Sequence, residues 1–112
     1  MKASGLLLKA KAKLDEDSWI QGFSALTKNG EMVSTSDRRA CKFCASGALS
    51  SVASTPKYGL VAFIEAAEFL DDAVIGKYKG DIVSFNDAKG RKLEQVLKIF
   101  DRAAAAAKKV GK

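Results

Sequence analysis

The amino-acid sequence predicts an α+β domain that is mainly α, with about four helices packed beside a small antiparallel sheet of two or three strands. Four stretches repeat apolar residues at the three- and four-residue spacing of an amphipathic helix. Two other intervals are rich in residues that favour strands or hairpin turns. The 112 residues contain one proline, and their apolar fraction of 47% is enough to build one core. We therefore expect a single domain that spans residues 1–112.

Each predicted helix carries one apolar stripe that we expect to face the core. A hydroxyl residue within Ser34–Asp37 can cap the second helix, and Pro56 can separate the second helix from the third. The alanine run 103–107 strengthens the fourth helix through its high intrinsic propensity. The expected helices and their inward residues are 3–14 with Ala3, Leu7, Ala10 and Leu14; 36–54 with Ala40, Phe43, Cys44, Gly47, Ala48, Ser51 and Val52; 58–72 with Leu60, Phe63, Ile64 and Ala67; and 90–109 with Leu93, Val96, Leu97, Phe100, Ala104 and Ala107.

Two intervals between these helices are expected to be extended. Residues 20–34 hold Asn29-Gly30, a dipeptide typical of tight hairpin turns, between short apolar stretches. Residues 80–87 hold the strand-favouring side chains of Ile82 and Val83. We expect a hairpin in the first interval and a strand in the second.

The composition limits the classes of function. The net charge of +6 is spread over both halves of the chain, so it favours acidic partners without indicating a basic tail. The chain contains no histidine, which excludes Ser-His and Cys-His catalytic pairs and argues against an enzyme. We expect neither a cofactor nor a metal ion.

The sequence also predicts a cytoplasmic protein that does not enter the membrane. Lys9 interrupts the first apolar run too early for a secretory signal. The apolar stretch 59–70 is broken by Glu65 and Glu68 and is too short to span a bilayer. Two cysteines without a secretion signal agree with a reducing compartment.

Cys41 and Cys44 are the most chemically suggestive pair in the chain. On a helix, Cys44 would lie in the apolar stripe and Cys41 at its edge. Arg38, Arg39 and Lys42 could lower the pKa of a thiol at Cys41. A zinc site would need four ligands, and two cysteines without histidine do not supply them. We favour core positions, and a thiol-redox function is an alternative.

Basic residues recur on two of the predicted helices. On the fourth helix they lie opposite the apolar stripe, and the first helix repeats their spacing with Lys2 added at its start. If the two helices are neighbours, their basic rows form a face for an acidic protein surface or for phosphates, although a plain solvated face is the simplest alternative. The predicted partner-binding residues are Arg91, Lys98, Arg102, Lys109, Lys9 and Lys13.

The third predicted helix carries only acidic charges. Glu65, Glu68, Asp71 and Asp72 occur with no basic residue between positions 58 and 76. DNA would repel such a helix, so we do not interpret the second and third helices as a helix-turn-helix motif.

Several short motifs follow one another in a fixed order. They are Trp19-x-Gln21-Gly22, Asp37-x-x-Ala40, Cys44-Ala45-x-Gly47-Ala48, Asn86-Asp87, and a closing helix with Glu94-x-Val96-Leu97 and Phe100-Asp101-Arg102-Ala103. The set resembles a family of small uncharacterised proteins, a domain of unknown function seen in bacterial and phage genomes, over about residues 4–106. Phe43 stands where that family typically has tryptophan, and Cys41 belongs to no part of the pattern.

The resemblance implies a compact, mainly helical fold and gives no reaction. Its polar members, Trp19, Gln21, Asn86 and Asp87, either tie the hairpin to the last helix or line a small pocket. We favour the tie because buried amide and carboxylate groups need hydrogen-bond partners.

We therefore expect a small non-enzymatic interaction protein, phage-encoded if the resemblance extends that far. It would bind and modulate a bacterial or host protein through a charged helical surface. Nucleic-acid binding through the basic rows is one alternative. Thiol-redox chemistry at Cys41 and Cys44 is the other.

Overall fold

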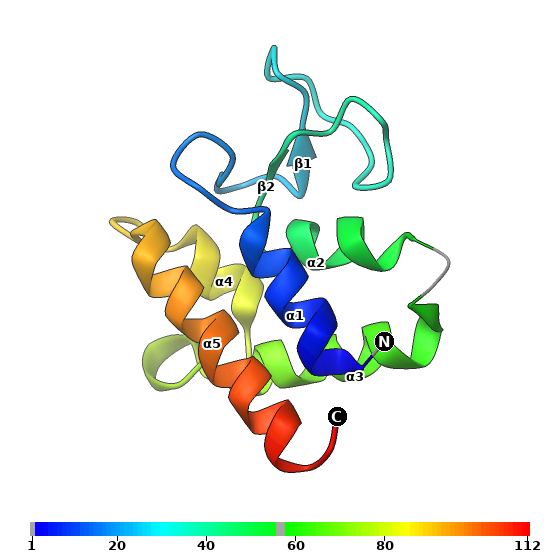
Figure 1. Ribbon diagram of the computed structural model, residues 1–112. Coiled ribbons are helices and arrows are strands. Elements are labelled where there is room, and N and C mark those ends of the chain that lie inside the picture. Colours follow the sequence, from blue (N-terminus) through cyan, green and yellow to red (C-terminus); the bar gives the residue numbers. More distant parts are fainter. Residues whose placement is uncertain (1, 56–57) are drawn as a thin grey trace.

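The computed structural model describes residues 2–55 and 58–112 and confirms an α+β fold that is mainly α (Figure 1). The long helices pack together, and the small sheet with its loops lies beyond one end of α1 and α2 (Figure 1). The elements in chain order are α1 (Ala3–Ala12), β1 (Ala25–Leu26), β2 (Lys42–Phe43), α2 (Ala45–Ala53), α3 (Gly59–Asp72), the short 3-10 helix η1 (Gly76–Tyr78), α4 (Ile82–Asp87) and α5 (Leu93–Lys109).

Helices α1 and α5 run antiparallel and side by side. The backbone N–H of Ser4 donates to the Lys112 carbonyl at 3.0 Å. Near the other end of α1, Lys11 Nζ lies 2.7 Å from Asp101 Oδ1. Helices α2 and α3 close the core around this pair. The largest fully buried apolar side chains of these four helices are Leu6, Leu7, Leu49, Leu70, Val96 and Phe100.

The first and last predicted helices are confirmed, although α5 begins at Leu93 rather than near residue 90. All the expected inward residues of the first helix are buried, including Leu14 just beyond the end of α1. The expected inward residues of α5 are also buried, except Leu97, which is half-buried. Ile99 and Ala103 add to this buried side.

The third predicted helix forms as α3, but its predicted inward side is wrong in part. Leu60 is 71% exposed and Ile64 is 45% exposed, whereas Ala66 and Leu70 are buried. The segment carries apolar residues on more than one side, and the side with the small Ala66 allows close packing on α1 and α5. The larger side chains at the start of α3 are left outside.

The second predicted helix is wrong over its first half, because α2 begins only at Ala45. Phe43 is buried from strand β2, which pairs antiparallel with β1. Upstream, Asp37 Oδ1 accepts a hydrogen bond from the Arg39 N–H at 2.7 Å. Such a local turn competes with the start of a helix. Ala40 is therefore half-buried in a turn and does not belong to a helical stripe.

The predicted strand in residues 80–87 is also wrong, because this segment forms helix α4. Asp81 Oδ1 caps the helix by accepting from the Ser84 N–H at 3.0 Å. Asp71 Oδ1, at the end of α3, accepts from the Ile82 N–H at 3.0 Å. These two carboxylates satisfy amides that have no partner within α4, and they override the local strand preference.

The predicted turn at Asn29-Gly30 is confirmed in the structure. Gly30 has φ of 86°, in the left-handed region that glycine adopts without strain. The two arms of the turn meet in an isolated bridge between Leu26 and Met32. The regular sheet has two strands, and the ladder partner of β1 is β2.

Gly47, in the first turn of α2, packs directly on the backbone that precedes β1. A Cβ atom at this position would overlap the carbonyl oxygen of Ser24. This close approach fixes the sheet and its loops against α2, and only glycine permits it.

We expect Gly47→Ala to lower the free energy of unfolding by about 2 kcal/mol or more, because the backbone of α2 or of Ser24 must move. Urea unfolding followed by circular dichroism measures the loss. Ser46→Ala, in the same turn, is the control and should change stability by less than about 0.5 kcal/mol. Equal unfolding midpoints for the two variants would contradict the close approach.

Candidate functional site

Asn86, near the end of α4, is completely buried, which is unusual for an amide side chain. Its Oδ1 accepts from Trp19 Nε1 at 2.7 Å and from the backbone N–H of Ala45 at 3.0 Å. Its Nδ2 donates to the Ile20 carbonyl at 3.1 Å and to Asp87 Oδ1 at 2.9 Å. All four hydrogen-bonding positions of the amide are used, which offsets the desolvation of the buried polar group.

Gln21 and Gly22 extend the same set of contacts. Gln21 Nε2 lies 2.9 Å from the carbonyl oxygens of both Asn86 and Ala88. The backbone N–H of Gly22 donates to Asp87 Oδ1 at 2.9 Å. We call this set the Asn86 cluster: the side chains of Trp19, Gln21, Asn86 and Asp87 with the backbone of Ile20, Gly22 and Ala45.

The Asn86 cluster brings together the four polar residues that the motifs singled out. It joins the loop before β1 to the start of α2 and the end of α4, whereas the sequence suggested a tie to the last helix. The backbone groups of Ile20 and Ala45 are members that no side-chain pattern could reveal. Among the described residues, every buried side-chain nitrogen and oxygen has a hydrogen-bond partner. The cluster therefore presents no free buried polar atom to a ligand.

A depression of about 430 Å³ opens beside the half-buried Trp19. The sequence left open that the motif residues line a small pocket, and Trp19 does line this depression. Its remaining lining residues are charged or apolar and come from the loop after α1 and from the beginning of α5 with the two residues before it: Glu16, Arg91, Lys92, Leu93 and Glu94.

Arg91 does not belong to an exposed basic row, which corrects the sequence prediction. It precedes α5 and is half-buried. Its Nε donates to the Phe85 carbonyl at 2.8 Å, and its guanidinium lies 3.6 Å from the centre of the Phe85 ring. Nη1 lies 3.3 Å from Gln95 Oε1. Arg91 therefore connects α4 to the first turn of α5, and its charge is engaged within the fold.

The other predicted basic residues fall into two separate groups. Lys98, Arg102 and Lys109 are exposed along the outward side of α5. Lys9 and Lys13 lie on the side of α1 that faces α2, in a groove shared with residues of α2. The Lys9 ammonium lies 5.9 Å from the centre of the Tyr58 ring, and the Lys13 ammonium lies 5.3 Å from the centre of the Phe43 ring. Lys11, not Lys9 or Lys13, is the lysine of α1 that reaches α5.

The two cysteines occupy different environments. Cys44 is buried at the N-cap of α2, and its Sγ accepts from the Gly47 N–H at 3.3 Å. Burial raises the pKa of the Cys44 thiol, and the negative charge of Asp87 raises it further. Cys41 is exposed in the turn before β2. The prediction that both lie on one helix is wrong, and the expected core position is confirmed for Cys44 but wrong for Cys41. The raised pKa of Cys44 does not favour a thiolate pair.

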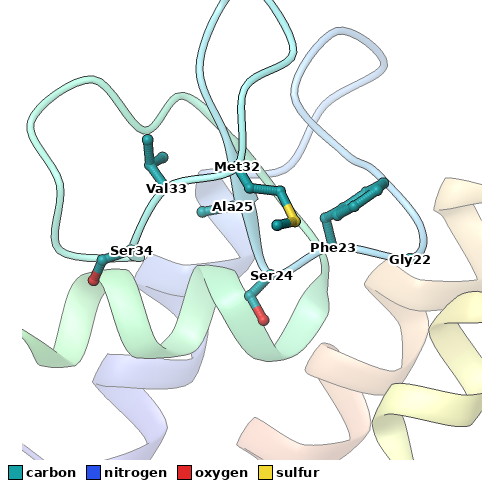
Figure 2. A pocket seen from close by; sticks show the side chains of 7 residues that line it. All are labelled: Gly22, Phe23, Ser24, Ala25, Met32, Val33 and Ser34. Atoms are coloured by element: carbon teal, nitrogen blue, oxygen red, sulfur yellow. The ribbon is translucent and has the colours of Figure 1, made fainter.

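An apolar hollow of about 490 Å³ lies beside β1 and was not predicted (Figure 2). Figure 2 shows the side chains of Phe23 and Met32 close to each other among the residues that line it. Phe23 is 46% exposed and Met32 is 71% exposed. In the sequence, this hollow could have been recognised from two large apolar residues, Phe23 and Met32, on either side of a polar turn. Gly22 lines the hollow, and its backbone N–H donates to Asp87 Oδ1. The Asn86 cluster therefore fixes one wall of the hollow.

Among the described residues, no three side chains of the types that bind metals gather at one place. Every helix of the described ranges is also too short or too polar to cross a lipid bilayer.

The fold and the site define a small, mainly helical α+β domain whose motif residues converge on a buried amide. The chain belongs to a family of unknown function, DUF6197, whose family model matches residues 1–106. The resemblance to an uncharacterised family is thereby confirmed, and its bacterial or phage setting stays a prediction. No curated protein and no solved structure matches the chain.

Asn86→Asp keeps the shape of the side chain but removes both Nδ2 donors and places a second negative charge beside Asp87. We expect it to lower the free energy of unfolding by about 3 kcal/mol at neutral pH. Burial and Asp87 should raise the pKa of the new carboxyl, so the folded state binds more protons than the unfolded state. Stability relative to the wild type should therefore recover as the pH falls through this raised pKa.

Urea unfolding of both proteins across a pH series measures the effect. Asn29→Asp, in the exposed turn, is the matched control and should shift stability by less than about 0.5 kcal/mol. If Asn86→Asp were as stable as the wild type at neutral pH, the Asn86 cluster would not support the fold.

Iodoacetamide should modify Cys41 in the folded protein and Cys44 only after unfolding, because Cys44 is buried and its pKa is raised. Timed labelling read by mass spectrometry should give one modified cysteine without urea and two with urea. A Cys41→Ser variant should take no label until urea is added. Equal labelling rates for the two thiols in the folded protein would contradict the buried position of Cys44.

Proposed function

We propose that the chain is a non-enzymatic protein-binding module that captures an acidic surface of another protein through the outward side of α5. The supporting observation is the row of exposed cations at Lys98, Arg102 and Lys109, which we call the α5 basic row. None of the three forms an ion pair with the part of the chain that the structure describes. Asp101, on the same helix, is already paired with Lys11.

The first two members of the α5 basic row repel each other, whereas Lys109 lies in the last turn, where the helix dipole favours a cation. Lys98 and Arg102 lie one turn apart, and like charges at this spacing destabilise a helix by about 0.2–0.5 kcal/mol. The opposite side of α5 buries Val96 and Phe100, so the row stands on a rigid support. A partner therefore loses little free energy in ordering the helix that carries these charges. Electrostatic attraction would speed and orient binding to an acidic surface.

In this proposal the partner is a bacterial or host protein in the cytoplasm, and binding modulates that protein. Lys9, Lys13 and Arg91 take no direct part, because they lie away from the α5 basic row or are engaged within the fold. The lack of histidine and the raised pKa of the Cys44 thiol support surface binding over catalysis.

The test is a triple charge reversal, Lys98→Glu, Arg102→Glu and Lys109→Glu. Its matched control reverses three exposed cations elsewhere, Lys28→Glu, Arg38→Glu and Lys79→Glu, with the same change in net charge. Affinity capture with quantitative mass spectrometry should identify a protein retained by the wild type and by the control. The α5 variant should lose at least about tenfold in affinity for that purified protein.

Equal capture by both variants would refute a role for the α5 basic row. A parallel titration with duplex and single-stranded DNA addresses the second class of partner. Binding that weakens steeply with salt, and that only the α5 variant loses, would replace the protein partner with nucleic acid. Circular dichroism of all variants confirms that each one is folded.

A further inference from the structure

Three large apolar side chains stand outside the core on the first two turns of α3. Leu60 and Val61 are each 71% exposed, and Ile64 is 45% exposed. A hollow of about 410 Å³ lies beside them, between the end of α2 and the start of α3, and Ala53, Leu60 and Phe63 supply its apolar lining. Apolar patches of this kind on a small protein mark interaction surfaces more often than scattered exposed residues do.

The same outward side of α3 becomes acidic toward its C-terminal end. At 100° per residue, Leu60, Val61, Ile64, Glu68 and Asp72 fall within about 120° of one another. Glu68 and Asp72 are exposed, and neither forms an ion pair within the described chain. We call these five residues the α3 stripe. It is apolar in its first half and negatively charged in its second.

The chain itself shows that a carboxylate in the middle of α3 accepts a lysine. Lys112 Nζ lies 2.7 Å from Glu65 Oε2, at the edge of the α3 stripe. This hydrogen bond raises the pKa of Lys112, as does its attraction to Glu65, and the charge of Glu68 adds to the effect. Among the described residues, Lys112 pairs directly with Glu65 alone, which leaves Glu68 and Asp72 for other cations.

We propose that the α3 stripe is a second docking site, which binds a basic amphipathic helix of a partner protein. Apolar side chains of that helix pack on Leu60, Val61 and Ile64, and its lysines or arginines face Glu68 and Asp72. The partner helix would thus be bound through apolar and charged contacts at the same time. The acidic half of the α3 stripe selects partner helices that carry cations next to their apolar residues. The site is independent of the α5 basic row.

A second copy of this chain fits the α3 stripe less well. Most pairs of identical chains are related by a two-fold axis. Two α3 helices that cover the whole stripe would then run antiparallel, with each acidic half facing the apolar half of the other copy, or parallel, with the two acidic halves facing each other and repelling. Neither arrangement supplies a cation to the carboxylates. Burying Glu68 and Asp72 against Ile64 and Leu60 would remove carboxylates from water without supplying a cation.

The probe is a synthetic amphipathic peptide with leucines in the first half of one helical side and lysines in the second half of the same side. A control peptide carries glutamates in place of the lysines. Titration into the isotopically labelled full chain, followed by amide NMR, should shift signals of α3 and of the end of α2. The control peptide should bind at least about tenfold more weakly.

Variants of the protein separate the two halves of the stripe. Ile64→Ser should weaken binding of the lysine peptide by about tenfold, because an apolar contact is lost. Glu68→Lys should weaken it and reduce its dependence on salt. Val83→Ser, an apolar residue of α4 that is 49% exposed, is the control and should leave the affinity unchanged.

Absence of saturable shifts, or equal affinities for Ile64→Ser and Val83→Ser, would overturn the proposal. Sedimentation of the wild type over a range of concentrations tests the second copy. Self-association that Ile64→Ser abolishes would assign the α3 stripe to a dimer and would also overturn the proposal. Neither result bears on the α5 basic row, which the triple charge reversal tests separately.

Discussion

The buried amide of Asn86 is the interaction on which the other parts of the structure depend. Helix α4 has six residues and the sheet has two strands of two residues, so neither would be stable in isolation. Asn86 holds both, because one side chain bonds the loop before β1, the start of α2 and Asp87. Without that amide, the buried Ala45 N–H would lose its partner, and an unsatisfied buried group costs about 1–3 kcal/mol. The part-buried Trp19 N–H would lose its partner as well.

In this arrangement, several residues that carry the family resemblance have a structural role. The Trp-x-Gln-Gly motif supplies donors to Asn86 and Asp87 and to the carbonyls at the end of α4. In the Cys44-Ala45-x-Gly47-Ala48 motif, Cys44 caps α2 and Gly47 admits the backbone of Ser24. These two motifs therefore serve the fold, whereas the motif of the closing helix also contributes Arg102 to the α5 basic row.

The fold class and the two outer helices could be predicted because their evidence is local. The apolar period of α5 continues without interruption from Leu93 to Ala107, and its buried side follows directly from that period. Helix α4 had one local signal, its N-cap Asp81, but the carboxylate of Asp71 that also satisfies its first turn comes from a different helix. The inward side of α3 was ambiguous in the sequence, since apolar residues occur on more than one side. The four motif residues of the site could be named, but the backbone groups that complete it depend on tertiary contacts.

The net charge of +6 is a poor guide to what this molecule attracts, because the charges are sorted by helix. The outward side of α5 presents Lys98, Arg102 and Lys109, whereas the described outward side of α3 ends in Glu68 and Asp72. At physiological ionic strength the screening length is about 8 Å, so a docking partner senses the charges it touches more than the total. Under the two proposals, α5 and α3 would therefore bind partners of opposite charge on one small support.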